Sequence, residues 1–127
     1  MPSHEIKFKE ITEKIIGAAF EVHNALGNGF QEVVYQRALA IELQRAELNF
    51  EREVEQEIFY KDTKVCIGKR RIDFIVSGKV LIEIKALSEL NDAHKAQILN
   101  YMKLYNLEVG LLINFGGKSV TFKRFVL

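Results

Sequence analysis

The first third of the chain carries apolar residues at helical spacing. In the first segment they lie three or four positions apart, at Ile11, Ile15, Ala18, Ala19, Val22 and Leu26. This spacing predicts a helix from about residue 4 to the turn Gly27-Asn28-Gly29, where glycine ends the pattern. A second helical pattern runs from Gln31 to about Ala46, through Tyr35, Ala38, Leu39 and Leu43. Two helices therefore precede the first strand.

From Phe50 onward the pattern becomes the alternation that is typical of β-strands. Between Phe50 and Tyr60 the alternation predicts two faces, with Phe50, Val54 and Ile58 on one and Glu51, Glu53, Glu55 and Glu57 on the other. Two more strands, 65–76 and 80–86, flank Ser77-Gly78-Lys79, which is typical of a hairpin turn. Residues 91–105 again form a helical pattern, and 109–115 and 120–126 read as strands around Gly116-Gly117-Lys118.

The predicted order of elements is ααβββαββ. A helix that connects a meander of strands to a later strand indicates a mixed β-sheet with helices packed on it. We therefore expect an α/β fold, a mixed sheet flanked by helices, rather than a barrel or a bundle. The chain has 127 residues with no internal repeat or linker, so residues 1–127 are expected to form a single domain.

Composition narrows the class of protein. With 48% hydrophobic and 28% charged residues and one proline, a compact globular protein is expected. Cys66 is the only cysteine, so it forms no intrachain disulfide, and we expect it to be a small buried hydrophobe in a reducing compartment. The sequence resembles no signal peptide and has no membrane-spanning run, which favours an intracellular, cytoplasmic protein with no membrane partner. The net charge of +1 leaves the partner and the oligomeric state open.

Three charged side chains interrupt two strands that should be buried. Asp73 lies in the strand before the Ser77-Gly78-Lys79 turn, and Glu83 and Lys85 lie in the strand after it. If this turn holds three residues, Asp73 and Glu83 are cross-strand partners, with Cβ atoms about 4.5–5.5 Å apart. Two such carboxylates repel each other unless a cation lies between them, and oxygen ligands suit Mg²⁺ or Mn²⁺ better than zinc. Lys85 on the same face could donate to a phosphate oxygen, so the spacing indicates a phosphodiester site; a solvated salt-bridge ladder is the alternative.

Two helices offer further groups. Glu32 and Tyr35 share a face near the start of the second helix, although Glu32 could simply complement the helix dipole. In the last helix His94, Gln97 and Tyr101 form one polar stripe, which by default faces solvent.

Charged clusters on the strands add candidate contacts. The cluster Lys69-Arg70-Arg71 could contact phosphate, and the glutamate row 51–57 would repel nucleic acid, so we expect that row to lie away from the substrate.

In order along the chain, these residues resemble the PD-(D/E)xK nuclease superfamily. The pattern is Asp73, then Glu83-Ile84-Lys85, then a helix that carries Gln97. Gln97 and Tyr101 are similar to the Gln-x-x-x-Tyr motif of the RecB-type branch, and residues 29–35, GFQEVVY, resemble the signature of the GxxExxY proteins placed in that superfamily. The resemblance covers about residues 6–126, with Ile72 in place of the superfamily's proline.

The resemblance implies a restriction-endonuclease-like core and a metal-dependent nuclease acting on nucleic acid, with DNA as the favoured substrate. Asp73 and Glu83 would hold Mg²⁺ or Mn²⁺ with the Ile84 carbonyl, and Glu32 would hold a water molecule of the metal or a second ion. Lys85 would orient or activate the attacking water, and Gln97 would position Lys85 or the substrate. Substrate contacts are expected from Tyr35, Arg71, His94 and Tyr101. The alternative is a non-catalytic nucleic-acid-binding or protein-interaction module that retains the fold.

Overall fold

The structure, a computed structural model, describes residues 8–127. Within this range the elements follow the predicted order: α1 (Lys9–Leu26), α2 (Glu32–Arg45), β1 (Phe50–Phe59), β2 (Cys66–Val76), β3 (Val80–Lys85), α3 (Asp92–Leu104), β4 (Val109–Asn114) and β5 (Thr121–Val126). The helix start predicted at about residue 4 lies outside the described residues. The predicted end of the first helix is confirmed, because Gly27 caps it with a positive φ of 69° that glycine adopts without strain.

The five strands form one mixed sheet in the order β1-β2-β3-β4-β5. Strands β3 and β4 are parallel, and the other neighbours are antiparallel. Parallel strands need a crossover connection, which α3 supplies. The predicted α/β fold with a mixed sheet is therefore confirmed.

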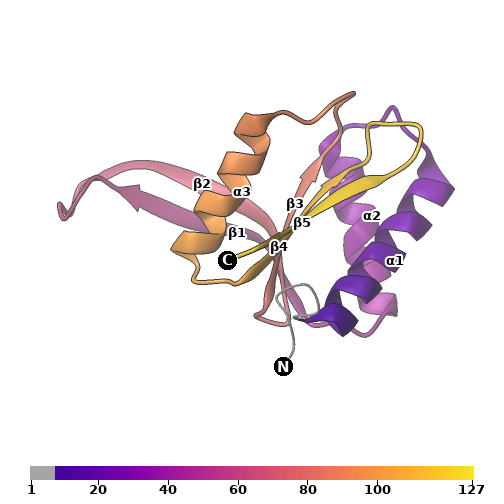
Figure 1. Ribbon diagram of the computed structural model, residues 1–127, viewed down its shortest axis with the longest axis horizontal. Coiled ribbons are helices and arrows are strands. Elements are labelled where there is room, and N and C mark those ends of the chain that lie inside the picture. The colour runs from indigo at the N-terminus through magenta and orange to yellow at the C-terminus, as the bar shows by residue number, and fades with distance from the viewer. Residues whose placement is uncertain (1–7) are drawn as a thin grey trace.

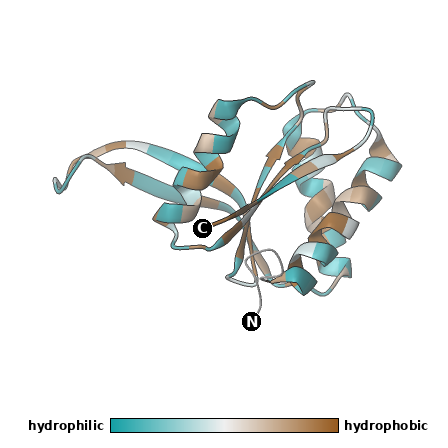
Figure 2. Ribbon diagram, in the orientation of Figure 1, coloured by the Kyte–Doolittle hydropathy of each residue, from teal (hydrophilic) through white to brown (hydrophobic). Residues whose placement is uncertain are grey.

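Helices cover both faces of the sheet. Helices α1 and α2 pack on one face and α3 on the other (Figure 1). The central strands β3 and β4 are buried on both sides, and the apolar colouring concentrates there and on the inner sides of the helices (Figure 2). Among the described residues no helix has the length and apolar character that a bilayer crossing requires.

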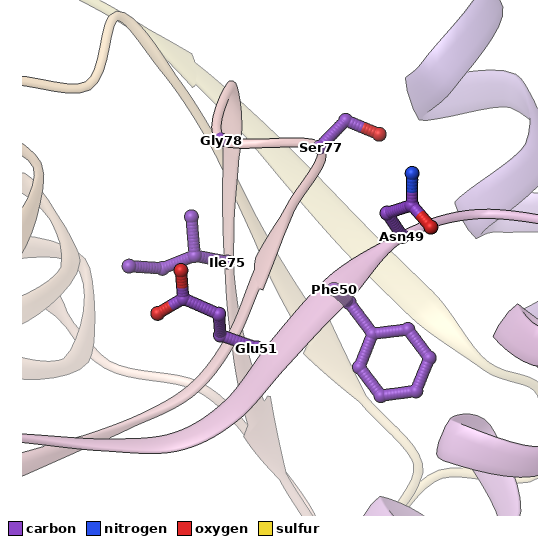
Figure 3. A pocket seen from close by; sticks show the side chains of 6 residues that line it. All are labelled: Asn49, Phe50, Glu51, Ile75, Ser77 and Gly78. Atoms are coloured by element: carbon purple, nitrogen blue, oxygen red, sulfur yellow. The ribbon is translucent and has the colours of Figure 1, made fainter.

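The core-facing side chains of β1 and β2 change from one face of the sheet to the other at Glu53 in β1 and Asp73 in β2. Before this level Phe50 and Phe74 belong to the core under α1 and α2, whereas beyond it Val54 and Ile72 belong to the core under α3. Figure 3 shows Phe50 pointing away from Ile75 and Glu51, which lie on the other side of the two strands.

The prediction that Phe50 and Val54 share one face is therefore wrong. The reason is local: Glu53 has a φ of 54°, in the left-handed region, and this turns the strand over. The register is the same on both sides of the turn, Arg52 with Phe74 and Val54 with Ile72, so the two strands turn together.

Beyond that level β1 and β2 form a projecting hairpin, residues 54–72, which we call the arm. It extends to the left in Figure 1, with α3 beside it. Cys66 lies on the arm and is exposed, as are Phe59, Val65 and Ile67. The expectation of a buried Cys66 is wrong because the outer part of the arm has left the cover of the helices.

The segment after β3 is fixed to β4 by one buried side chain. The Asn114 Oδ1 accepts hydrogen bonds from the N–H groups of Leu87 and Gly116, at 2.9 and 3.1 Å, and its Nδ2 donates to the Leu87 carbonyl at 2.9 Å. Gly116 approaches so closely that a Cβ on it would lie 2.2 Å from the Leu87 carbonyl oxygen. This contact fixes the direction of the chain directly after Lys85.

Replacing Gly116 by alanine should therefore destabilise the protein by about 1–3 kcal/mol, because backbone atoms must move. Gly17→Ala is the matched control: Gly17 is exposed in α1, its added Cβ would meet nothing within 4 Å, and alanine should stabilise the helix by about 0.5–1 kcal/mol. Urea unfolding of both variants measures the difference. Equal stability of Gly116→Ala and the unmodified chain would contradict the close approach.

Candidate active site

The turn between β2 and β3 holds three residues, as predicted. Val76 pairs with Val80, Ile75 with Leu81 and Phe74 with Ile82. The regular ladder stops there, one position before Asp73 and Glu83 would pair.

Side chains replace the backbone ladder at that position. The Ile84 N–H donates to Asp73 Oδ2 at 2.7 Å, and the Asp73 N–H donates to Glu83 Oε1 at 3.4 Å. The two carboxylates are thus brought together, as the three-residue turn predicts. They do not form a regular cross-strand pair, because the Asp73 carboxylate lies in the gap between β2 and β3 and takes the place of a backbone acceptor.

The second oxygen of Asp73 is held by a residue that sequence reasoning missed. Gln36 of α2 is buried, and its Nε2 donates to Asp73 Oδ1 at 3.0 Å. Its Oε1 accepts from Arg52 Nη2 at 3.3 Å, so the amide links α2 to β1 and β2. The available signal was the spacing: Gln36 stands four residues after Glu32 and therefore shares its helix face.

Burial makes the carboxylate pair hard to ionise. Glu83 is only 6% exposed, and desolvation, with Asp73 as the next cause, raises its pKa from 4.5 to about 8. Burial also raises the pKa of Asp73, although the hydrogen bonds from Ile84 and Gln36 and the charge of Lys85 oppose the shift. Burial and the charge of the neighbouring carboxylate therefore both favour the protonated form of Glu83.

Glu32, Lys85 and His94 belong to the same electrostatic environment. Burial raises the pKa of Glu32, the Lys85 charge lowers it, the Asp73 charge raises it and His94 lowers it. Figure 1 shows why: α2 and α3 both begin at the end of the sheet where β3 ends. His94 is fixed by a capping box, in which its N–H donates to Asn91 Oδ1 and its Nδ1 accepts from the Asn91 N–H, both at 3.1 Å.

Gln97 and Tyr101 lie further along α3, beside the arm. Gln97 is exposed and borders a hollow together with Tyr101 and Arg70. Tyr101 is 7% exposed, its ring lies 4.8 Å from the Arg70 guanidinium, and burial followed by the Glu83 charge raises the pKa of its hydroxyl. Arg71 is exposed on the arm, in a shallow hollow with Glu55.

Tyr35 is a core residue, which corrects the expectation of a substrate contact. It has no exposed surface, and its hydroxyl donates to the Gly27 carbonyl at 2.7 Å and accepts from the Phe30 N–H at 3.3 Å. Its ring stacks on Phe115 at 4.8 Å. The tyrosine therefore anchors the α1–α2 turn that directs the start of α2 toward the sheet end.

The glutamate row of β1 is also placed differently from the expectation. Glu53 lies close enough to Asp73 for its charge to raise the pKa of that carboxyl. The row therefore does not lie wholly away from the site, because the turn at Glu53 occurs at the level of Asp73.

The donors at the site are compatible with a divalent cation. Among residues 8–127 no three His, Cys, Asp or Glu side chains are gathered closely enough to hold a metal ion by themselves. Asp73 and Glu83 are an adjacent pair of hard oxygen donors. Burial and, after it, the Asp73 charge raise the pKa of Glu83, and a bound cation would oppose the effect of that charge. The role of Glu32 as a ligand stays a prediction.

Comparison with protein families identifies the superfamily to which this fold belongs. A family model described as the PD-(D/E)XK nuclease superfamily matches residues 9–125. The chain belongs to the PD-(D/E)XK nuclease superfamily. The mixed α/β fold is consistent with this superfamily. A comparison with curated proteins gave no match.

A solved structure supports the fold. The structure titled "Crystal structure of SSO0001" is similar with a TM-score of 0.58 and 27% sequence identity. The similarity covers 73% of this chain and 48% of that chain, so this chain spans about half the length of that protein.

The raised pKa of Glu83 predicts how stability depends on pH. Glu83 is harder to ionise in the folded state than in the unfolded state, so the protein takes up a proton when it folds in this pH range. The contribution of Glu83 to the free energy of unfolding therefore falls as pH rises from 4.5 toward 8. Glu83→Gln removes this loss and should gain on the order of 3 kcal/mol over the unmodified chain between pH 5 and pH 8. Urea unfolding with a chelator present measures it.

The matched control is Glu57→Gln, which removes the same charge from an exposed position on β1. Its stability should run parallel to that of the unmodified chain at every pH. If the stability of Glu83→Gln also ran parallel to that of the unmodified chain as pH changes, the raised pKa of the buried Glu83 carboxyl would be contradicted.

Proposed function

We propose that this chain is a metal-dependent nuclease that hydrolyses phosphodiester bonds in nucleic acid, with DNA as the favoured substrate. The observation that carries the proposal is the placement of the Asp73 and Glu83 carboxylates next to each other and close to Lys85. A buried pair of repelling carboxylates costs stability, and groups with strongly shifted pKa values concentrate at functional sites. A module that only binds nucleic acid has no need of such a pair.

The chain's own groups would take distinct roles. Asp73 and Glu83, with the Ile84 carbonyl, would hold Mg²⁺ or Mn²⁺. When bound, the cation supplies positive charge that stabilises the developing negative charge on the phosphate and the leaving oxygen. The hydrogen bonds from Ile84 and Gln36 fix both oxygens of Asp73, so this ligand needs little reorganisation on binding.

Lys85 would act on the attacking water and on the phosphate. It follows Glu83 by two residues in β3, so both side chains belong to one face of the strand. Its ammonium group can donate to a phosphate oxygen and orient a water molecule. Glu32 is coupled to Lys85 and is suited to accept a hydrogen bond from that water.

Within the superfamily, we propose that the chain belongs to the GxxExxY group and carries the RecB-type motif. The GFQEVVY segment, residues 29–35, supports the GxxExxY group, because its glutamate, Glu32, is coupled to the site and its tyrosine, Tyr35, anchors the turn before it. The placement of Gln97 and Tyr101 beside Arg70 supports the RecB-type motif. A single domain and an intracellular location remain the expectations from the sequence.

The test is cleavage of labelled single- and double-stranded DNA and RNA in the presence of Mn²⁺ or Mg²⁺. The unmodified chain should cleave, and a chelator should stop cleavage. Lys85→Ala should lower the rate by about 10²-fold or more, because a group that stabilises transition-state charge is removed. Lys14→Ala, an exposed lysine of α1, is the matched control and should retain the full rate.

Equal rates for Lys85→Ala and Lys14→Ala would assign the cleavage to a contaminant and contradict the proposal. Metal-independent binding of nucleic acid, with no cleavage of any substrate, would favour the non-catalytic module instead.

A further inference from the structure

We propose that Arg52 of β1 is a positioning residue of the carboxylate site: through the Gln36 amide it holds the Asp73 carboxylate in one orientation, in which that carboxylate can receive a cation. That a cation binds there rests on the proposed function. The orienting contact itself belongs to the cation-free protein, so it can be tested separately.

Two hydrogen bonds connect Arg52 to Asp73. The Arg52 Nη2 donates to Gln36 Oε1 at 3.3 Å, and the Gln36 Nε2 donates to Asp73 Oδ1 at 3.0 Å. Gln36 is only 6% exposed, whereas Arg52 is an exposed residue. Both ends of the buried amide are therefore used, and they connect an arginine at the surface to a carboxylate of the candidate active site.

The guanidinium is the partner that sets the orientation of the Gln36 amide. An arginine can only donate hydrogen bonds, so the amide atom that faces Arg52 must be the oxygen. The amino group of the amide then points the other way, toward Asp73. A carboxyl group can accept a hydrogen bond or, when protonated, donate one, so Asp73 alone would allow either orientation of the amide. Arg52 excludes one of the two.

The oriented amide completes the fixation of Asp73. The Ile84 N–H holds Oδ2 at 2.7 Å, and the Gln36 amide holds Oδ1. One donor on each oxygen fixes the plane of the carboxylate and still leaves a lone pair on each oxygen for a cation. Contacts that orient a metal ligand in this way commonly change metal affinity by about 10–100-fold.

The shape of β1 places Arg52 where it makes this contact. Phe50, two residues earlier, belongs to the core under α1 and α2, so Arg52 points to the same side of the strand. The next residue, Glu53, has a φ of 54° and turns the strand over. Left-handed residues other than glycine cost free energy and concentrate at functional sites. Arg52 therefore stands where β1 turns, on the side that faces α2.

The charge of Arg52 alone predicts the opposite effect on a cation. A positive charge close to a cation site repels the ion, so removal of the Arg52 charge by itself would strengthen binding. Loss of the orienting contact instead weakens binding, because the Gln36 amide then holds Asp73 less firmly. The sign of the change in affinity therefore distinguishes a positioning residue from a charge that merely stands nearby.

Calorimetric titration of the full chain with Mn²⁺, at one fixed pH, measures this sign. Arg52→Ala should weaken Mn²⁺ binding by about tenfold. Arg52→Lys keeps a donor and the charge, and its affinity should stay within about threefold of that of the unmodified chain. Gln36→Met removes the amide and should weaken binding at least as much as Arg52→Ala. Combining the two substitutions should weaken binding no further than Gln36→Met, because the arginine acts through the amide.

The matched control is Arg45→Ala. Arg45 is an exposed arginine at the end of α2, and its Nη1 donates to Glu42 Oε1 at 3.4 Å. The control thus loses the same side chain and a similar contact, and its affinity for Mn²⁺ should be unchanged. Urea unfolding in a chelator checks that every variant folds. A merely structural contact would lower the stability of Arg52→Ala and leave its affinity for Mn²⁺ unchanged.

A second measurement needs no cation. NMR spectroscopy in a chelator measures how fast the two Nε2 protons of Gln36 exchange with water. In Arg52→Ala the amide loses its fixed orientation, so this exchange should become about tenfold faster, which corresponds to about one lost hydrogen bond. In Arg45→Ala the exchange rate should be that of the unmodified chain.

Three results overturn the inference: unchanged or tighter Mn²⁺ binding by Arg52→Ala, additive effects of Arg52→Ala and Gln36→Met on affinity, or an unchanged exchange rate of the Gln36 protons in Arg52→Ala. The first of these leaves the proposed function intact, since Mn²⁺ is still bound. If the unmodified chain binds no Mn²⁺, the proposed function fails, and the exchange rate decides whether Arg52 orients the amide that holds Asp73.

Discussion

The site depends on one hydrogen bond, from the Ile84 N–H to Asp73 Oδ2 at 2.7 Å. In a regular sheet the Ile84 N–H would pair with a backbone carbonyl of β2, and both strands would continue together. Here a carboxylate takes that position, so β2 separates from β3 after three backbone pairs. The separation opens the gap that holds Asp73 beside Glu83, and it sends the arm out from the body beside α3. The candidate active site and the hollow next to it thus have one structural origin.

The same interaction explains the electrostatic strain at the site. Asp73 cannot move away from Glu83, because Ile84 and Gln36 hold its two oxygens. Glu83 is buried in β3, and this burial, followed by the Asp73 charge, raises its pKa to about 8. Lys85 and Glu32 complete a group of charges contributed by β2, β3 and α2. For a member of the PD-(D/E)XK nuclease superfamily, such strain is consistent with a site that is stabilised when a cation binds.

The sequence predicts most of the fold, since each element has strong periodicity and a clear end signal. Glycine at residue 27 marks a helix end that the structure confirms. The approach of Asp73 and Glu83 could also be predicted, because the length of the turn fixes the register. The exchange of faces at Glu53 could not, since a single residue with positive φ leaves no mark on an alternating pattern. Gln36 was missed for a related reason: its function depends on a contact with β2 that arises only after the strands separate. Tyr35 was misassigned because a motif position does not distinguish a core tyrosine from an exposed one.

The most direct test of this account is the proton balance of metal binding. Calorimetric titration with Mn²⁺ at pH 7, in two buffers that differ in ionisation enthalpy, counts the protons released per ion. Because Glu83 is protonated at this pH and must ionise to act as a ligand, the account predicts release of close to one proton. The release should disappear near pH 9.5 and in Glu83→Gln. Binding with no proton release at pH 7, or with the same release in Glu83→Gln, would contradict the claim that Asp73 and Glu83 form the metal site.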